Sequence, residues 1–567
     1  MPNPFETRRT KLKNERESWV TRAKDIALYT VPQYDRYDNQ ENRNRGDINF
    51  DKILDSTATM ASEVTASGFM TGITNPSKPW LILTHPDFRV MQSPRVKQYL
   101  YETTRIILET YGRSNLYNTL PPLYQQLSLF GTAALFMQED KGDFIRSFNF
   151  APGEYYLAQN DLGIIDTLYR DFSMTYIQLV NKFGIDNVSE KVRSNVIQGK
   201  NLDVWINVTH AIEPKNKYLK GVDEEVSPEA KWRSVYYEAG RSRSEVGGDG
   251  YLRVSGFMEF PVMAPRWHTI SNDVYGWGRG SVCLGDIKQL QYQTEEKAKA
   301  IEKMVNPPLK APSSMDYTDI NNVAGGVSFY DANSSSTEGF RTLYEVDIKI
   351  EALLADIADI RDRIKQCFYV DAFAMISELD RAQITATEIV ERRDEKLLKL
   401  GTVYHRLNDE LLDPMVDRTF NVLSRAGQLP EPPPELEGVN LKVEYLSILA
   451  QAQKSHVLGN IERTIQFVAG LAEAKQDPSV WDKHNTDQAI TDYFEASAVP
   501  PNHVFPDDVV ANVRGQRARI QQAQQAVEMA SKGAEAARSA SDAEINQEGD
   551  TVLSTISEQV RQAANAG

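Results

Sequence analysis

Two helical segments with apolar stripes, separated by a long polar excursion, constrain the fold of this chain more than any other feature. Residues 283–305 and 350–368 carry apolar side chains at the 3.6-residue spacing of an amphipathic helix. An Asn-Pro-Pro sequence at 306–308 ends the first helix, because proline removes a backbone hydrogen bond and its ring collides with the preceding turn. Residues 309–344 are rich in Ser, Asn, Gly and Asp. We expect an antiparallel helix pair that carries a functional tip.

The rest of the chain predicts a mixed α+β body. Short β-like runs punctuated by glycine follow residue 144, and their regular turns indicate antiparallel pairing, without the βαβ alternation of a nucleotide-binding sheet. Strands are predicted at 144–150, 154–159, 164–170, 203–212, 231–238, 251–258, 327–330 and 441–446. Helices are predicted at 56–68, 94–111, from Pro121-Pro122 through Ala134, at 173–183, and at 385–424 with a kink at Pro414. The Ala- and Gln-rich tail from about residue 507 is either a helix stabilised by neighbouring copies or a partly disordered end.

Composition and missing motifs exclude several function classes. The chain has 567 residues and a formal net charge of −16, the wrong sign for wrapping nucleic acid tightly. It lacks a P-loop, a G-x-S-x-G elbow and His or Cys pairs at metal-ligand spacing, so we expect no catalytic residue, no metal and no cofactor. The two cysteines, Cys283 and Cys367, suit free thiols in a reducing cytosol. The longest nearly apolar stretch, 127–137, is too short for a membrane span, so no membrane partner is expected.

Two local patterns allow more than one interpretation. The glycine-rich segment 276–281 suits an anion-binding loop, but it does not match G-x-G-x-x-G and a tight turn into a helix is favoured. The first 24 residues hold seven basic and three acidic side chains. This excess suits contact with nucleic acid or an acidic partner, but a solvated helix face around Trp19 and Ile26 is favoured.

Four segments in this order resemble the portal, or head-to-tail connector, proteins of short-tailed, podovirus-type bacteriophages. FMEFPVMAPRWHTISNDVYGWGRGSVCLGDIKQL (257–290) resembles the run before the family's first stem helix, and NPPL (306–309) resembles the end of that helix. ITATEIVERRDEKLLKLG (384–401) resembles the opening of a long helix, and FNFAPGEYYLAQNDLGIIDTLYRDFSMT (148–175) resembles the β region. The resemblance covers about 51–446 and leaves the tail unmatched.

The resemblance implies a ring-forming subunit, typically one of twelve copies, at one vertex of the virion capsid. It divides the chain into a wing (1–275 and 382–505), a first stem helix (276–305), a clip (306–343), a second stem helix (344–368), a tunnel loop (369–381) and a crown, barrel or flexible tail (506–567). The implied partners are the major capsid protein, the scaffolding protein, the terminase large subunit during packaging, the tail adaptor and double-stranded DNA. Assembly takes place in the host cytoplasm, and the motor ATPase belongs to the terminase.

Candidate residues follow from these regions. The DNA-channel candidates are Arg363, Lys365 and Arg381, for which intersubunit or surface ion pairs are the competing interpretation. The candidates for binding adaptor or terminase are the clip aromatics Tyr317, Phe329, Tyr330 and Phe340, which equally suit a small clip core. A two-helix stem has too little to bury alone, so we expect neighbouring copies to cover its stripe residues Ile287, Leu290, Ile301, Leu353, Ile357, Ile360 and Ile364.

Two other function classes compete with a portal subunit. A cytosolic multidomain hydrolase, with a site built from residues remote in sequence, would have a saturable cleft in a monomer or small oligomer. Another phage structural protein, of tail or scaffold, would share the acidic composition but lack the arrangement of helix, clip and helix.

Overall fold

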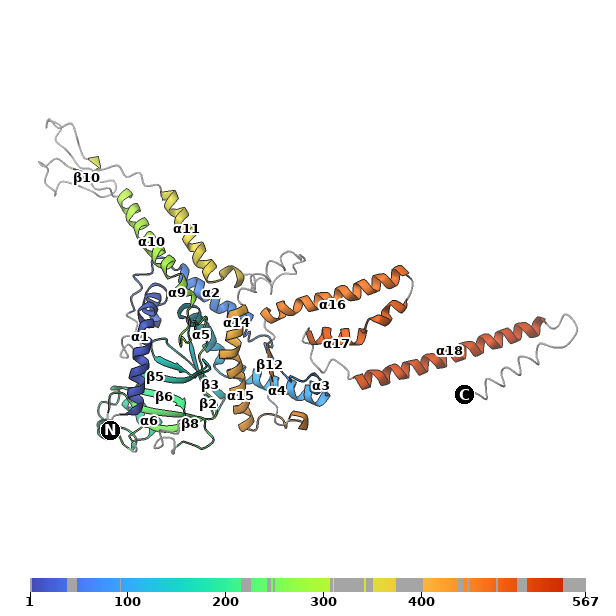
Figure 1. The fold of residues 1–567 in the computed structure, drawn as a ribbon, viewed down its shortest axis with the longest axis horizontal. Coiled ribbons are helices and arrows are strands. Elements are labelled where there is room, and N and C mark those ends of the chain that lie inside the picture. The colour runs from blue at the N-terminus through green and yellow to red at the C-terminus, as the bar shows by residue number, and fades with distance from the viewer. Residues whose placement is uncertain are drawn as a thin grey trace. The chain divides into compact units, whose positions relative to one another are not determined.

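The computed structural model divides the chain into two compact units, Met1–Ala496 and Ser497–Gly567. The first unit contains both helices and sheets, as the α+β expectation requires, and the described part of the second unit is one helix (Figure 1). The structure describes residues 3–37, 48–91, 93–215, 226–241, 246–247, 250–305, 309–310, 341–342, 350–373, 401–436, 442–445, 448–475, 478–496 and 507–543.

The two larger antiparallel sheets among the described residues form what we call the β part of the first unit. The larger has the strand order β4-β5-β6-β7-β8 and the smaller β3-β2-β9. All of their pairings are antiparallel, which confirms the prediction from the glycine-punctuated runs. The strands are β2 (Ala134–Asp140), β3 (Phe144–Phe150), β4 (Tyr155–Gln159), β5 (Ile165–Thr175), β6 (Trp205–Pro214), β7 (Trp232–Glu238), β8 (Arg253–Phe257) and β9 (Val262–Met263). The predicted strand at 327–330 lies outside the described residues.

The end of β5 corrects one predicted boundary. The strand continues to Thr175, and α6 (Tyr176–Phe183) begins three residues later than expected. The Thr175 hydroxyl accepts a hydrogen bond from the backbone N–H of Gln178, and the Gln178 side chain accepts one from the backbone N–H of Thr175. This reciprocal capping box fixes the start of the helix, and its Thr-x-x-Gln pattern was present in the sequence.

The first helix, α1 (Pro4–Thr30), packs against the larger sheet (Figure 1). Asn3 caps it, because its side-chain oxygen accepts a hydrogen bond from the backbone N–H of Phe5 at 3.1 Å. Phe5 and Leu12 are buried in one apolar cluster with Tyr169 and Tyr237 of the sheet. Burial of this helix face therefore fastens the N-terminal segment to the β part.

A second, largely helical core lies beside the sheets. It joins α2 (Thr57–Gly72), α4 (Pro94–Arg113), α5 (Leu116–Phe130), α14 (Gly401–Leu407) and α15 (Asp413–Arg425) in one apolar cluster. The predicted strand near residue 441 is β12 (Lys442–Tyr445), which pairs antiparallel with β1 (Leu81–Thr84). Trp80, next to β1, stacks on Tyr111 of α4 and on Tyr445 of β12. Segments far apart in sequence therefore share one core.

Two prolines do not start α5, contrary to the prediction. The helix runs from Leu116 to Phe130, so Pro121 and Pro122 lie inside it, and Ala134, which was predicted to belong to this helix, begins β2 instead. Each proline lacks the N–H that would bond to the carbonyl four residues earlier, in the first turn. Leu116 and Leu120 are fully buried. Their burial holds the extra turn in helical form and offsets the missing hydrogen bonds.

The helix around Pro414 is irregular, as predicted. A π-helical turn, η4 (Asn408–Leu412), separates α14 from α15, and Pro414 lies at the start of α15. A wider turn at this point accommodates the proline ring, which cannot donate a backbone hydrogen bond. Residues 385–400 of the predicted helix lie outside the described residues.

The remaining elements complete the two units. In the first unit, α16 (Ile448–Lys475) contacts η6 (Pro478–Lys483) and α17 (Thr486–Ala496). In the second, α18 (Asp507–Ala543) is helical, which is the first of the two alternatives for the described part of the tail. Among the described residues no helix is long and apolar enough to cross a membrane. The shorter elements are η1 (Pro32–Tyr34), α3 (Phe88–Met91), α7 (Glu190–Ile197), α9 (Arg279–Val282) and η5 (Pro434–Leu436).

Candidate functional site

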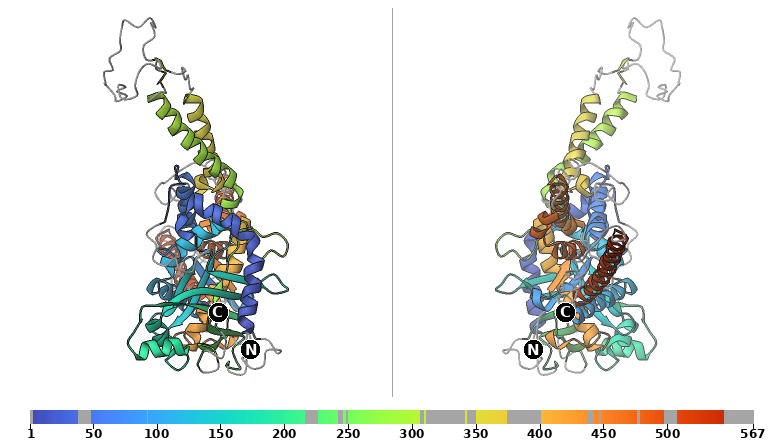
Figure 2. Two further views of the ribbon diagram at one scale, coloured as in Figure 1. Left: turned by 90° about the vertical axis from the view of Figure 1, so that its left-hand side faces the viewer. Right: turned by 90° about the vertical axis from the view of Figure 1, so that its right-hand side faces the viewer.

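The two predicted amphipathic helices form a hairpin. α10 (Leu284–Val305) and α11 (Ile350–Cys367) pack side by side and lead away from the sheets (Figure 2). Beyond them, β10 (Leu309–Lys310) pairs antiparallel with β11 (Arg341–Thr342), so the two ends of the polar excursion meet. We call α10, α11 and this short ladder the hairpin, its end next to α9 the root, and its end next to the ladder the tip.

The root of the hairpin is covered by its own chain. Its buried stripe residues, each at most 1% exposed, are Ile287, Leu290, Ile357, Ile360 and Ile364. They share an apolar cluster with residues of α1, α2 and α5, namely Ile26, Ala58, Ala61 and Leu129. The expectation that neighbouring copies cover these stripe residues is therefore wrong for the root. Helices remote in sequence supply the apolar surface that a two-helix stem lacks.

Toward the tip, apolar side chains of the same two helices are exposed. Ile301 is 42% exposed, Leu354 46% and Val305 80%, whereas Leu353 is half-buried. The described residues of the chain leave Ile301, Leu354 and Val305 with these exposed fractions. The hairpin therefore has a root that one subunit packs by itself and an outer half with apolar surface left over.

Polar contacts also fasten the root to the loop before α2. The Gln291 side-chain oxygen accepts hydrogen bonds from the backbone N–H groups of Leu54 and Asp55, at 2.7 and 2.8 Å, and its amide donates to the Asp55 carbonyl at 2.8 Å. Arg361 of α11 forms an ion pair with the Asp55 carboxylate at 2.7 Å. Burial alone would raise the pKa of Asp55, but hydrogen bonds from Thr57 and the ion pair with Arg361 outweigh it and lower the pKa.

Two of the three predicted DNA-channel cations lie on the hairpin in ion pairs. Arg363 contacts Asp286 of α10 at 3.4 Å and Asp359 at 3.8 Å, and Lys365 contacts Asp362 at 3.2 Å. Both cations are about half exposed, so these pairs contribute little stability. The third candidate, Arg381, lies outside the described residues, as do the clip aromatics Tyr317, Phe329, Tyr330 and Phe340.

The glycine-rich segment before α9 is a close backbone crossing. A Cβ atom on Gly276 would lie 2.3 Å from the carbonyl oxygen of Gly131, and one on Gly278 would lie 2.5 Å from the Gly131 backbone nitrogen. Gly131 itself has φ +82°, a left-handed conformation that ends α5. The segment is therefore a tight turn that leads into a helix, which is the interpretation favoured from the sequence. Its glycines have no side chains, so the backbone at the end of α5 can approach them closely.

Comparison with known proteins identifies the family. The family described as "Bacteriophage head to tail connecting protein" matches residues 4–504. This chain belongs to that family of connector proteins. It is 39% identical to the "Portal protein" of Salmonella phage epsilon15 over 537 residues, 94% of each chain. It is 38% identical to the "Probable portal protein" of Bordetella phage BPP-1, over 93% of each chain, and 25% identical to the "Portal protein" of Escherichia phage T7, over 83% of each.

Membership of the connector family bears on the three functions considered from the sequence, namely a portal subunit, a hydrolase and another phage structural protein. The match extends well beyond the resembling segments at 148–175, 257–290 and 384–401 and includes the N-terminal helices. Near-complete matches to proteins named portal protein support a structural connector and not a hydrolase. They likewise argue against a tail or scaffolding component.

Three basic residues at the connector's N-terminus hold α1 to the body, a role that neither sequence interpretation gave them. Arg9 forms an ion pair with the buried Asp171 of β5 at 2.6 Å. Arg22 lies over the ring of Trp277, 4.0 Å from its centre. Arg16 is buried and donates to the backbone carbonyls of Pro152, Gly153 and Tyr155. These contacts make Arg9, Arg16 and Arg22 packing residues, whereas Arg8, Lys11 and Lys13 are exposed, as expected of a solvated helix face.

Two buried arginines of the connector tie η4 and α15 to the β part, and the sequence analysis missed both roles. Arg266 forms an ion pair with Glu410 of η4 at 2.7 Å and also donates to the carbonyl of Gly163. Arg418 of α15 donates to the carbonyl of Met137 in β2. Glu410 lies 144 residues from Arg266, and Met137 lies 281 residues from Arg418, so neither contact leaves a local sequence pattern. The one signal in the sequence was that Arg266 lies in a segment that resembles the family.

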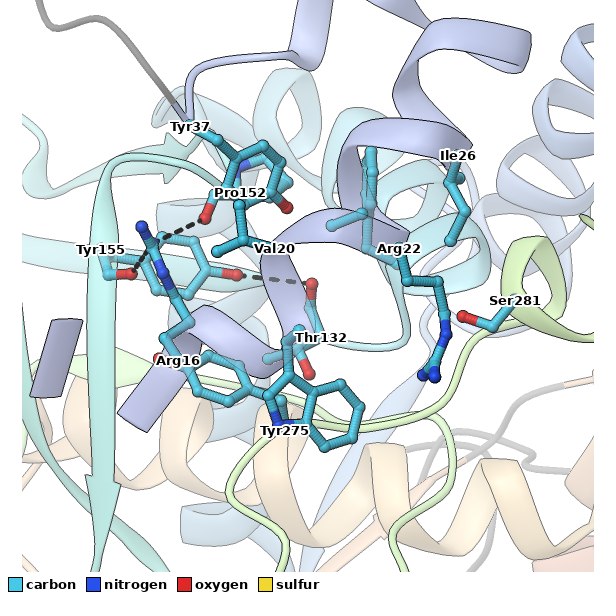
Figure 3. Close-up of a pocket in the computed structure, with 13 residues that line it drawn as sticks. Arg16, Val20, Arg22, Ile26, Tyr37, Thr132, Pro152, Tyr155, Tyr275 and Ser281 are labelled. Atoms are coloured by element: carbon cyan, nitrogen blue, oxygen red, sulfur yellow. Dashed lines mark hydrogen bonds between the residues drawn. The ribbon is translucent and has the colours of Figure 1, made fainter. Parts of the chain in front are cut away.

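A small cavity lies between α1 and the loops beside it (Figure 3). Its volume of about 40 Å³ has room for a few water molecules but not for an organic substrate. Burial raises the pKa of the three lining phenols, Tyr37, Tyr155 and Tyr275, so they remain neutral. Within the described ranges, no group of three or more His, Cys, Asp or Glu residues is placed to hold a metal ion.

Proposed function

We propose that this chain is the portal subunit of a bacteriophage, one of about twelve copies in a ring at one capsid vertex. Double-stranded DNA enters the capsid through the ring during packaging and leaves through it during ejection. The observation that carries the proposal is the match to portal proteins over almost the whole chain. The hairpin, with a long excursion between two paired helices, agrees with it.

Within this proposal the chain divides as the resemblance implies. The wing comprises 1–275 and 382–505, the stem 276–305 and 344–368, the clip 306–343, the tunnel loop 369–381, and the crown or barrel 506–567. The clip docks the terminase large subunit during packaging and the tail adaptor afterwards. The wing meets the major capsid protein and, during assembly in the host cytoplasm, the scaffolding protein.

The exposed outer half of the hairpin supports ring formation. Ile301, Leu354 and Val305 leave apolar surface uncovered, and neighbouring copies around an axis would bury it. Full burial of an exposed side chain of this kind is worth roughly 1.5–3 kcal/mol, and because Ile301 and Leu354 are already partly covered, each gains only about half of it at each junction of a ring. We therefore propose that the stem contact between copies involves this outer half, next to Leu353, which is half-buried and packs against the root cluster of its own chain.

The acidic composition suits a conduit. Duplex DNA carries about one negative charge per 1.7 Å, and a body with net charge −16 per subunit repels it. Repulsion lets DNA slide in both directions without being held. Arg363, Lys365 and Arg381 are the proposed cations of the lining, and the ion pairs of the first two on the hairpin moderate their attraction for phosphate.

Electron microscopy of the purified protein tests the proposal. We expect rings of about twelve subunits with an axial hole. A stable monomer, or a small oligomer without an axial hole, would contradict the portal function.

The clip aromatics have a separate test. Replacing Tyr330 by alanine should weaken adaptor binding to intact rings, because buried aromatics often dominate protein interfaces. Unchanged affinity, with rings of normal appearance, would reject Tyr330 as an anchor and leave the portal function standing.

A further inference from the structure

The two cysteines of the chain meet at the root of the hairpin. Cys283 directly precedes α10 and Cys367 is the last residue of α11. Both side chains face the same backbone carbonyl oxygen, that of Arg279, with Sγ–O distances of 3.1 Å for Cys283 and 3.9 Å for Cys367. Both thiols are free. Residues 84 positions apart in sequence thus bring the only two sulfhydryl groups of the chain together.

The two sulfur atoms have different surroundings. Cys283 is buried in the root cluster, whereas Cys367 lies at its edge and is half-buried. A hydrogen bond from the Cys283 thiol lowers the pKa of Cys367, and nearby Arg279 lowers it further, against the opposing effects of burial and of Asp286. The same hydrogen bond and burial raise the pKa of Cys283. Cys367 is therefore the better nucleophile and the more accessible of the two.

We propose that Cys283 and Cys367 are a modification site, at which a low-molecular-weight disulfide such as oxidised glutathione forms an intrachain disulfide between the two helices of the hairpin. The Cys367 thiolate attacks one sulfur of the oxidant, forms a mixed disulfide and displaces one glutathione thiolate. That thiolate takes up the proton of Cys283. The Cys283 sulfur then attacks the Cys367 sulfur and releases the second glutathione as a thiolate, which takes up from water the proton that Cys367 lost when it ionised. Two protein thiols are oxidised and one glutathione disulfide is reduced to two glutathione molecules.

The cross-link would act at one place in the hairpin. It closes the loop 283–367 at the root, where the two helices already pack against α1 and α2, and leaves the tip unconstrained. In a reducing cytosol the pair remains as thiols, and it is oxidised only when the folded protein meets an oxidising medium. The site does not depend on the proposed ring, because both cysteines belong to one chain and meet within it.

The test is a thiol count on the full-length protein. The native protein is incubated with oxidised glutathione, freed of small molecules, denatured and titrated with Ellman's reagent. We expect the count to fall from two thiols per chain to none, and peptide mapping without reductant to join the peptides of Cys283 and Cys367. A reductant should restore both thiols.

Two single variants serve as matched controls. Cys283→Ser leaves Cys367 without a partner, so this residue should keep glutathione as a stable mixed disulfide. Cys367→Ser removes the accessible nucleophile, so the remaining thiol should stay free. The proposal is overturned if the wild-type protein retains two thiols, if it carries glutathione without the joined peptides, or if non-reducing electrophoresis shows disulfides between chains. None of these readouts changes if the protein fails to form rings.

Discussion

Replacing Ile360 by alanine tests whether the root of the hairpin is packed within one subunit. Ile360 is fully buried, and the change removes three carbon atoms, each worth about 0.8 kcal/mol of transfer free energy. The surrounding α1 and α2 residues hold the space open, so a cavity term of about 1 kcal/mol is added. We expect the free energy of unfolding to fall by about 3 kcal/mol.

Leu354→Ala, on the same helix, is the matched control. Leu354 is 46% exposed in the subunit, so the change should cost less than about 1 kcal/mol there, while it weakens association between copies. Urea unfolding followed by circular dichroism, at a protein concentration low enough to separate subunits, measures both variants. If both variants lost a similar, small amount of unfolding free energy, the root would not be packed within one subunit. A large loss for Ile360→Ala seen only in assembled rings would do the same.

Two further changes probe the surroundings of the root. Asp55 has a lowered pKa because bonds to its ionised form outweigh burial, so its contribution to stability is complete above its unfolded value, near pH 4, and is lost as the pH falls through the lowered folded value. Asp55→Asn should remove this part of the acid dependence in unfolding curves measured from pH 7 to pH 2, and an unchanged pH profile would contradict the ion pair with Arg361. Gly278→Ala places a Cβ atom 2.5 Å from backbone and should cost about 3 kcal/mol, whereas Gly285→Ala meets no atom within 4 Å and should be neutral or stabilising by up to about 1 kcal/mol. Thermal unfolding compares the two glycine variants, and similar melting temperatures would show that the backbone crossing tolerates a side chain.

Local patterns in the sequence predicted much of the fold. The apolar spacing of 283–305 and 350–368 identified both hairpin helices, and glycine-punctuated runs identified β3 and the five strands of the larger sheet, but β2 and β9 were missed. The periodicity of apolar residues shows which face of a helix or strand is buried, but not which other element packs against that face. It therefore identified Ile360 as apolar and inward-facing but could not show that α2 lies against it. Competition from neighbouring structure also moved two predicted helix starts, at Pro121 and at Ser173.

The candidate site was predictable only in part. The stripe residues of the hairpin were identified correctly as buried at the root, but their covering partner was assigned to other copies of the chain. The contact between Cys283 and Cys367 depends on how two helices pair, which residue spacing alone does not fix. The roles of Arg381 and of the clip aromatics such as Tyr330 stay predictions, because these residues lie outside the described part of the chain.

Because the hairpin root is packed within its own subunit, the entropy cost of ordering it is separated from the cost of association between copies. The backbone and side-chain entropy of ordering the root is lost when each chain folds, before two copies meet. Association then joins preordered rods and mainly costs translational and rotational freedom. In the proposed ring, each incoming copy would offer an outer hairpin surface whose root is already fastened by Gln291 and Arg361, so successive copies could repeat one geometry and close the ring.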